Sequence, residues 1–187
     1  MQERRKFLLL VTGALAGVAA IFASLPFFGA LSPPKNTERR EKFRIIDFSD
    51  LSEGQSFSVP IERKPLLVLK RSSTQIRALR QSNSDLLDPS SENSNQPDTV
   101  DVNIRSKRDD IFVAWNVCTH LRCAVNTIPE NDERFVTVFP KTGGFFCPCH
   151  GAKYDNAGRV YKKGPAPKNL KIPEYSFIDE TNLRVEY

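Results

Sequence analysis

The sequence is short of cysteine, of histidine and of excess charge. Its 187 residues include 4 cysteines and 2 histidines, too few cysteines for a small secreted domain that depends on disulfides. The formal net charge is only +5, and we find no basic cluster of the kind that binds nucleic acid. We interpret five basic residues of the C-terminal half as ordinary solvated charges: Lys168, Lys171, Arg105, Lys107 and Arg108. With 40% hydrophobic and 26% charged residues, a disordered or collagen-like chain is excluded as well.

Charge is absent altogether from the 25 residues between Phe7 and Leu31. As a helix, this segment would be about 37 Å long, which exceeds the roughly 30 Å hydrocarbon core of a bilayer. A removable signal peptide usually has a shorter apolar core of about 7–15 residues. We therefore predict that residues 7–31 form one N-terminal transmembrane helix that is retained as an anchor.

Arg4, Arg5 and Lys6 precede the apolar segment and predict its orientation. Basic residues beside a membrane span stay on the cytoplasmic side, so residues 1–6 should be cytoplasmic and the rest of the chain should lie outside. The run Arg4-Arg5-Lys6-Phe7-Leu8 also resembles a twin-arginine export signal, which carries folded proteins across the bacterial inner membrane.

A stalk and a head domain follow the anchor. Residues 32–41 contain two consecutive prolines and several charges, which is typical of a flexible linker. Residues 42–187 contain short runs of β-branched and aromatic residues between Gly, Pro and Asn, and predict an all-β antiparallel domain. One helix is expected over 73–80 and a long surface loop over 81–98. The expected strands are 43–47, 56–59, 66–69, 111–115, 135–139, 158–161, 175–178 and 182–186.

All four cysteines and both histidines lie within 33 consecutive residues, in two short boxes. The boxes are Cys118-Thr-His120-Leu-Arg-Cys123 and Cys147-Pro-Cys149-His150-Gly151. Zinc takes four such ligands, usually with other spacings, and would leave two cysteines without a role. A [2Fe–2S] centre with two histidines in place of two cysteines uses four residues and leaves one cysteine in each box, a pair that can close a disulfide. The sequence therefore favours iron over zinc.

The two boxes resemble those of the Rieske iron–sulfur proteins, specifically the Rieske subunit of the bacterial cytochrome bc1 complex. That family pairs C-T-H-L-x-C with C-P-C-H-G, then has Tyr-Asp and later Gly-Pro-Ala-Pro. This chain has Tyr154-Asp155 and Gly164-Pro165-Ala166-Pro167. The resemblance implies a Rieske-type head, an antiparallel β-sandwich with a cluster-binding subdomain over about 112–170.

The resemblance also implies the role of each residue in the boxes. One [2Fe–2S] cluster would be bound by Cys118 and Cys147 on one iron and by His120 and His150 on the other. The remaining cysteines, Cys123 and Cys149, would form a disulfide, which needs an oxidising compartment and so agrees with an external head.

By resemblance, the chain is the electron-transfer subunit of a quinol–cytochrome c reductase in the bacterial inner membrane. Its expected partners are quinol and the cytochrome b and cytochrome c1 subunits of a dimeric complex, with the head on the periplasmic side. His150 would face the quinol and accept its proton and electron, and the electron would pass to cytochrome c1. The loop Gly164-Pro165-Ala166-Pro167 would shield the cluster.

Two positions depart from the family pattern, and both bear on redox tuning. Arg122 stands where glycine is usual, and Ala152 stands where serine commonly donates a hydrogen bond to a bridging sulfide. Tyr154, which by resemblance donates to the sulfur of a ligand cysteine, is kept.

Two other Rieske classes are considered. The small Rieske subunit of a periplasmic molybdenum oxidase, such as arsenite oxidase, is the main alternative. A soluble Rieske ferredoxin lacks both the extra cysteine pair and the membrane span.

Overall fold

The computed structural model describes residues 1–31, 42–81, 84–135 and 141–187. The chain divides into two compact units, Met1–Arg40 and Glu41–Tyr187, and each is described by itself. The predicted stalk, 32–41, lies outside the described residues.

The first unit contains one long helix, α1, over Gln2–Leu31. The sequence predicted its apolar part over 7–31, but the helix begins five residues earlier. The basic residues are therefore its first turns and not a separate segment, because Gln, Glu, Arg and Lys all favour helix and Lys6 pairs with Glu3 at 3.3 Å. Within the described residues, α1 is the only helix long and apolar enough to cross a membrane.

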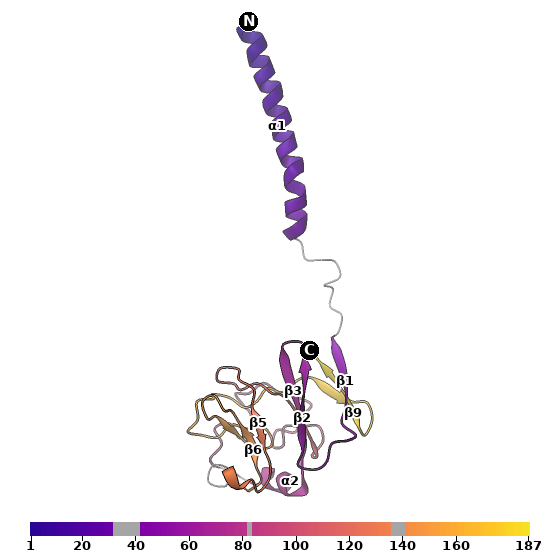
Figure 1. The fold of residues 1–187 in the computed structure, drawn as a ribbon, viewed down its shortest axis with the longest axis vertical. Coiled ribbons are helices and arrows are strands. Elements are labelled where there is room, and N and C mark those ends of the chain that lie inside the picture. Colours follow the sequence, from indigo (N-terminus) through magenta and orange to yellow (C-terminus); the bar gives the residue numbers. More distant parts are fainter. Residues whose placement is uncertain (32–41, 82–83, 136–140) are drawn as a thin grey trace. The chain divides into compact units, whose positions relative to one another are not determined.

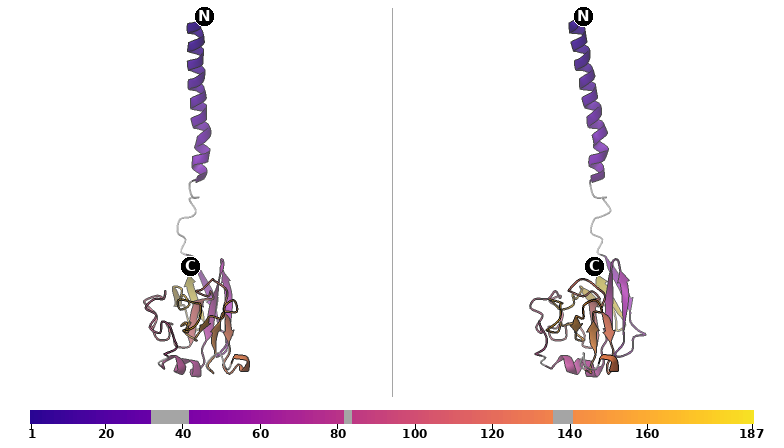
Figure 2. Two further views of the ribbon diagram at one scale, coloured as in Figure 1. Left: turned by 90° about the vertical axis from the view of Figure 1, so that its left-hand side faces the viewer. Right: turned by 60° about the vertical axis from the view of Figure 1, so that its left-hand side comes forward.

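The second unit is the β-rich head, and every strand pair in its described residues is antiparallel. Nine strands form three three-stranded sheets there, in the orders β1-β9-β8, β2-β3-β4 and β5-β6-β7 (Figures 1 and 2). The predicted fold class is confirmed. The strands are β1 (Phe43–Asp47), β2 (Ser56–Ile61), β3 (Lys64–Lys70), β4 (Ile111–Trp115), β5 (Asn126–Ile128), β6 (Gly144–Phe146), β7 (Lys153–Tyr154), β8 (Tyr175–Phe177) and β9 (Asn182–Glu186).

One hydrophobic core joins the three sheets. Strands β3 and β4 supply its centre, since four successive residues in each are buried. The core continues through Phe112, whose ring stacks on that of Phe145 in β6 at 5.7 Å between centroids. Cys118 and Cys147 are part of the same buried cluster. The two boxes are thus anchored directly on the core.

The only other regular helices in the described head are short. Helix α2 spans Ser73–Leu79 and agrees with the expectation over 73–80. Ser72 caps it in a capping box with Gln75, which satisfies two of the free N–H groups at the helix start. A single 3-10 turn, η2, covers Glu133–Phe135.

Two of the expected strands differ from the structure. The expected strand 135–139 begins at Phe135, in η2, and 136–140 lie outside the described residues. Residues 158–161 form only isolated bridges, Tyr154 with Val160 and Leu86 with Tyr161. No continuous strand forms there because the side-chain oxygen of Asn169 accepts a hydrogen bond from Val160 N at 2.8 Å. That N–H is not available to a neighbouring strand.

The segment 81–98, expected as a surface loop, is partly buried. Leu86 and Asp88 are 2% and 6% exposed. The Asp88 carboxylate accepts hydrogen bonds from Glu92 N, Asn93 N and Ser94 Oγ at 2.9, 3.2 and 2.6 Å. The prediction of a surface loop was wrong in this respect, because a buried carboxylate with three donors organises the segment from within.

Arg105, interpreted from the sequence as solvated, is fully buried. Its guanidinium donates to Leu170 O at 2.7 Å, to Ala157 O at 3.0 Å, to Gly158 O at 3.2 Å and to Gln96 Oε1 at 2.9 Å. Burial lowers its pKa to about 10, so the group stays protonated at neutral pH. The solvated interpretation was wrong, because five fixed N–H donors let arginine satisfy several backbone carbonyls at once.

Candidate metal centre

The two boxes are tight turns that follow strands. Box one, Cys118 to Cys123, lies between β4 and β5, and box two, Cys147 to Gly151, lies between β6 and β7. In box one Cys118 N donates to Cys123 O at 2.8 Å and Arg122 N to Cys118 O at 3.0 Å. In box two Cys147 N donates to Ala152 O at 2.8 Å and Gly151 N to Cys147 O at 3.0 Å. The two turns are closed by matching pairs of backbone hydrogen bonds.

Arg122 and Gly151 occupy equivalent places in these turns, and both have positive φ, 65° and 74°. This region suits glycine, which explains why glycine is usual at position 122 in the resembled family. An arginine there carries about 1–2 kcal/mol of backbone strain. The backbone at position 122 therefore keeps a left-handed conformation although arginine stands in place of glycine.

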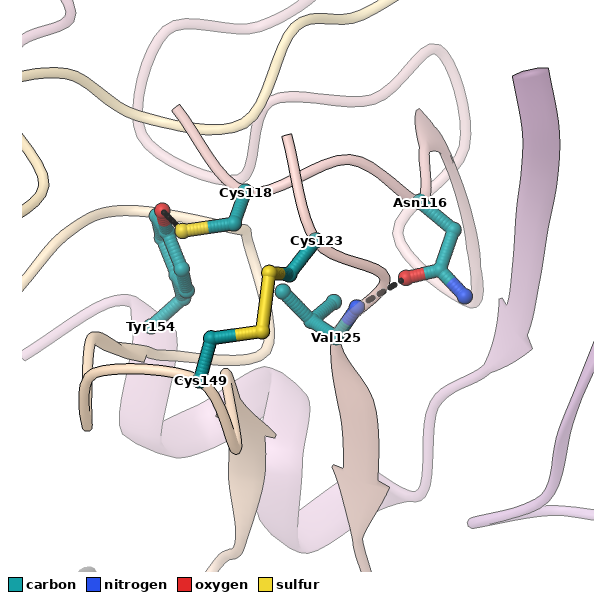
Figure 3. Close-up of a disulfide and its surroundings, with 6 residues drawn as sticks. All are labelled: Asn116, Cys118, Cys123, Val125, Cys149 and Tyr154. Carbon is teal, nitrogen blue, oxygen red and sulfur yellow. Dashed lines mark hydrogen bonds between the residues drawn. A yellow bond between two sulfur atoms is a disulfide. The ribbon is translucent and has the colours of Figure 1, made fainter. Parts of the chain in front are cut away.

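A disulfide between Cys123 and Cys149 joins the boxes, the pair that the resemblance implies (Figure 3). Its cysteines are 26 residues apart, and closing a loop of that length constrains the unfolded chain by about 3.5 kcal/mol. The Asn116 side chain holds the end of box one, since its Oδ1 accepts from Val125 N at 3.0 Å and its Nδ2 donates to Ser58 Oγ at 2.9 Å.

The other two cysteines, Cys118 and Cys147, are free thiols, 1% and 2% exposed. The Sγ atoms of Cys123, Cys147 and Cys149 lie within 4.8 Å of one another. Two of those sulfurs are already bonded to each other, so only Cys147 of the three can offer a thiolate. Burial raises the pKa of the Cys147 thiol, and the neighbouring Cys118 thiol adds to the rise. A bound metal would offset that cost by stabilising the thiolates.

The two histidine rings meet edge to face, with centroids 4.9 Å apart and planes at 82°. His120 Nδ1 is buried and has no hydrogen-bond partner in the described part of the chain, whereas His150 is exposed. A buried imidazole nitrogen without a partner is costly, and a metal ion would satisfy it. Two buried thiols and two imidazoles, held in boxes that the disulfide joins, are the donor set of a mixed Cys/His [2Fe–2S] centre, so the residues present fit that group.

Comparison with known proteins agrees with this geometry. Residues 87–176 match the family model described as "Rieske [2Fe-2S] domain". The "Ubiquinol-cytochrome c reductase iron-sulfur subunit" of Allochromatium vinosum is 35% identical over 182 residues, covering 97% of this chain and 87% of that one. The protein of the same name from Bradyrhizobium diazoefficiens is 34% identical over 183 residues, with coverage of 97% and 93%. The chain belongs to this family of Rieske iron–sulfur subunits.

Among solved structures, the chain is similar to "Hyperthermophilic respiratory Complex III", with a TM-score of 0.44 and 21% identity, over 92% of this chain and 94% of that chain. Family membership and the exposed apolar helix α1 together make the protein a single-pass membrane protein.

Tyr154 is the polar group beside the thiols of this Rieske subunit (Figure 3). Its hydroxyl oxygen lies 3.3 Å from Cys118 Sγ and accepts from Thr119 N at 3.2 Å. Thr119 Oγ1, 3.1 Å from the same hydroxyl, donates its own hydrogen to Lys168 O at 2.6 Å. Tyr154 therefore has one hydrogen for two acceptors within reach, Thr119 Oγ1 and Cys118 Sγ, and a Cys118 thiolate would be the stronger acceptor. Burial raises the pKa of Tyr154, which keeps it a neutral donor.

The Gly164–Pro167 loop packs against both boxes of the Rieske site. A Cβ placed on Gly164 would lie 3.8 Å from Ala152 Cα in the turn after box two. The bond from Thr119 Oγ1 to Lys168 O fastens the other end of the loop to box one. Ala152 is fully buried, and its methyl group offers no hydrogen-bond donor.

Three residues that position this site were not predicted from the sequence to do so. Thr119 lies within box one, and only this position in the sequence could have indicated its role. Asn169 donates Nδ2 to Asp88 O at 2.8 Å and to Ser91 Oγ at 3.0 Å, and so fixes the chain just after the loop. Arg105, described above, is the third, and nothing in its local sequence distinguishes it from a surface arginine.

Proposed function

We propose that this chain is the electron-transfer subunit of a quinol–cytochrome c reductase in the bacterial inner membrane. It would oxidise quinol at the outer side of the membrane, with release of protons, and pass the electron to cytochrome c1. The proposal is supported by relatives that bear the name ubiquinol–cytochrome c reductase iron–sulfur subunit. The observation that carries it is that two boxes joined by a disulfide hold two buried thiols and two imidazoles in contact with each other, of which one is exposed.

The proposed ligands are Cys118 and Cys147 on one iron and His120 and His150 on the other. When bound, the [2Fe–2S] cluster accepts and returns one electron. Two neutral imidazoles in place of two thiolates make the site less negative, which raises its potential into a range of about −150 to +300 mV. That range suits an acceptor of electrons from quinol.

His150 is the proposed contact for the quinol. Its side chain is exposed, whereas His120 is half-buried, so His150 is the more accessible of the two rings to an external substrate. An imidazole nitrogen can accept the hydrogen bond of a quinol hydroxyl and then take its proton. Because reduction makes the site more negative, it favours the protonated ring, and the proton and the electron leave the substrate together.

The basic N-terminus and the disulfide between the boxes support the proposed location. Arg4, Arg5 and Lys6 favour a cytoplasmic N-terminus and therefore a periplasmic head. A disulfide between the boxes is expected to persist in that oxidising compartment. Cytochrome b and cytochrome c1, in a dimeric complex, are the proposed partners.

Purification of the full-length chain from its own membranes in mild detergent tests this function. We expect two irons and two acid-labile sulfides per chain, a cluster signal that quinol elicits, and the heme spectra of b- and c-type cytochromes in the same fractions. Zinc in place of iron would refute the metal assignment. A molybdenum subunit in place of the cytochromes would indicate the oxidase alternative.

A further inference from the structure

Charge is distributed very unevenly over this chain. Three segments, 116–128, 141–154 and 160–173, contain the two boxes and the loop that covers them. They hold seven basic residues and no aspartate or glutamate, whereas the rest of the chain has 20 basic and 22 acidic residues. The basic residues are Arg122, Lys141, Lys153, Lys162, Lys163, Lys168 and Lys171. Because the segments are separate in the sequence, no basic cluster is visible there.

The fold brings three of these cations to the loops around His150. Arg122 is in box one, which the disulfide ties to box two, and Lys163 and Lys168 flank the covering loop. The loop is held to box one by the hydrogen bond from Thr119 Oγ1 to Lys168 O. All three side chains are exposed, and we call these three residues the basic rim.

The basic rim is not neutralised by the chain's own carboxylates. Among the residues that the structure describes, none of the three makes a salt bridge. Other exposed arginines of the head do pair, as Arg80 does with Asp109 and Arg134 with Asp132. The rim therefore presents uncompensated positive charge next to the exposed His150.

Two members of the rim are also in strained backbone. Arg122 and Lys163 have φ of 65° and 62°, where glycine would be free of strain. Each non-glycine residue in this conformation costs about 1–2 kcal/mol. Strain that is kept next to a reactive site points to a use for the side chain itself.

We propose that the basic rim is a docking surface for an acidic patch on the c-type heme protein that accepts the electron. This inference rests on the proposed function, which brings such a partner to the His150 end of the head. The only large apolar side chain exposed in the described residues of the two boxes is Leu121, 64% exposed. A single apolar residue within a ring of cations suits a brief encounter steered by charge better than a permanent apolar interface.

The test measures electron transfer from this chain to the heme in the purified full-length complex. A flash-activated oxidant removes one electron from the heme, and the rate of heme re-reduction is followed at several salt concentrations. Between about 10 mM and 1 M salt the screening length falls from about 30 to 3 Å. We expect the wild-type rate to fall several-fold over this range. Arg122→Gln/Lys163→Gln/Lys168→Gln should be slower by roughly threefold to tenfold at low salt and nearly independent of salt.

Two control variants and a redox titration make the result specific. Arg63→Gln/Lys64→Gln/Arg77→Gln removes the same charge from exposed positions in the β2–β3 turn, at the start of β3 and on α2, and should keep the wild-type rate and salt dependence. Arg122→Lys/Lys163→Arg/Lys168→Arg keeps the rim's charge and should show the wild-type rate and salt dependence. The midpoint potential of each variant is measured, because a change in driving force would slow transfer equally at high salt.

Several outcomes would overturn the docking surface. These are an unchanged salt dependence in the glutamine variant, a defect that persists in full at high salt, and a defect found only with anionic lipid, which would indicate lipid headgroups. A wild-type preparation without a cluster signal or without c-type heme would instead refute the proposed function, and it would do so before any variant is compared.

Discussion

Tyr154 allows the most direct test of the site, because replacing it with phenylalanine removes one hydroxyl group and little else. Its ring is fully buried, and the backbone pairing of Tyr154 with Phe145 does not involve the hydroxyl. The hydroxyl lies 3.3 Å from Cys118 Sγ, a sulfur that we propose as an iron ligand. Tyr154→Phe should therefore leave the fold intact, remove one hydrogen bond to that sulfur and leave Thr119 N without this acceptor.

The expected size of the effect follows from the charge on the acceptor. A hydrogen bond to a charged group contributes about 1.5–3 kcal/mol, and for one electron about 1.4 kcal/mol corresponds to roughly 59 mV. The whole bond would thus be equivalent to about 60–130 mV. The hydroxyl also lies 3.1 Å from Thr119 Oγ1, and only the strengthening of the bond on reduction affects the potential. We expect the midpoint potential to fall by about 60 mV, the lower end of that range.

Redox titration of the full-length protein in detergent, followed by the cluster's paramagnetic resonance signal, measures this shift. Tyr175→Phe is the matched control, because Tyr175 is also buried but its hydroxyl accepts from Lys107 N at 2.9 Å, outside the two boxes. The control should keep the wild-type potential. An unchanged or raised potential in Tyr154→Phe, with the cluster signal intact, would refute the assignment of Tyr154 as donor to Cys118.

Three further changes have expected outcomes. Ala152→Ser restores a hydroxyl after box two and should raise the midpoint potential by up to about 60–130 mV, the equivalent of a whole hydrogen bond. A titration that shows no rise would mean that the hydroxyl does not reach a sulfide. Cys123→Ser/Cys149→Ser should leave the proposed ligands in place but lower stability by up to about 3.5 kcal/mol and speed cluster loss, followed as decay of visible absorbance. Arg105→Met should lower the free energy of unfolding by about 3–5 kcal/mol in urea titrations, and a loss below 1 kcal/mol would contradict the role of Arg105 as a clamp.

Much of the fold could be predicted from the sequence where local pattern and structure agree. The strands β1, β4 and β9 have the expected bounds, because each has a run of strand-forming residues ended by a turn. The start of α2 was indicated by its serines, and Ser72 is the cap. The two boxes were recognisable because six metal-binding side chains rarely gather by chance in so short a stretch. The resemblance then implied the pairing of Cys123 with Cys149 that the structure contains.

The strands nearest the site could not be predicted, for physical reasons. Strands β5, β6 and β7 are only two or three residues long, too short to show alternation of apolar and polar residues. Gly158 has φ of +66°, and a Cβ there would lie 2.9 Å from the Phe112 ring, so the backbone itself packs on the core. Close packing of this kind depends on distant segments and leaves no periodic signal.

Buried arginines explain why the segment between β3 and β4 is not simply a loop. Arg71 is buried and donates to Asn156 O at 2.9 Å and Ile104 O at 2.7 Å, and Arg105 binds the carbonyl oxygens of Ala157 and Leu170. A hydrophobic residue in either place would avoid the cost of burying a charge, but it would leave these backbone carbonyls without donors inside the protein. Because the acceptors Asn156, Ala157 and Leu170 belong to the chain that follows box two, each guanidinium fastens the metal-binding end of the head to the segment before β4. Loss of either arginine should therefore weaken the attachment of the metal-binding end to the segment before β4, although every proposed ligand would still be present.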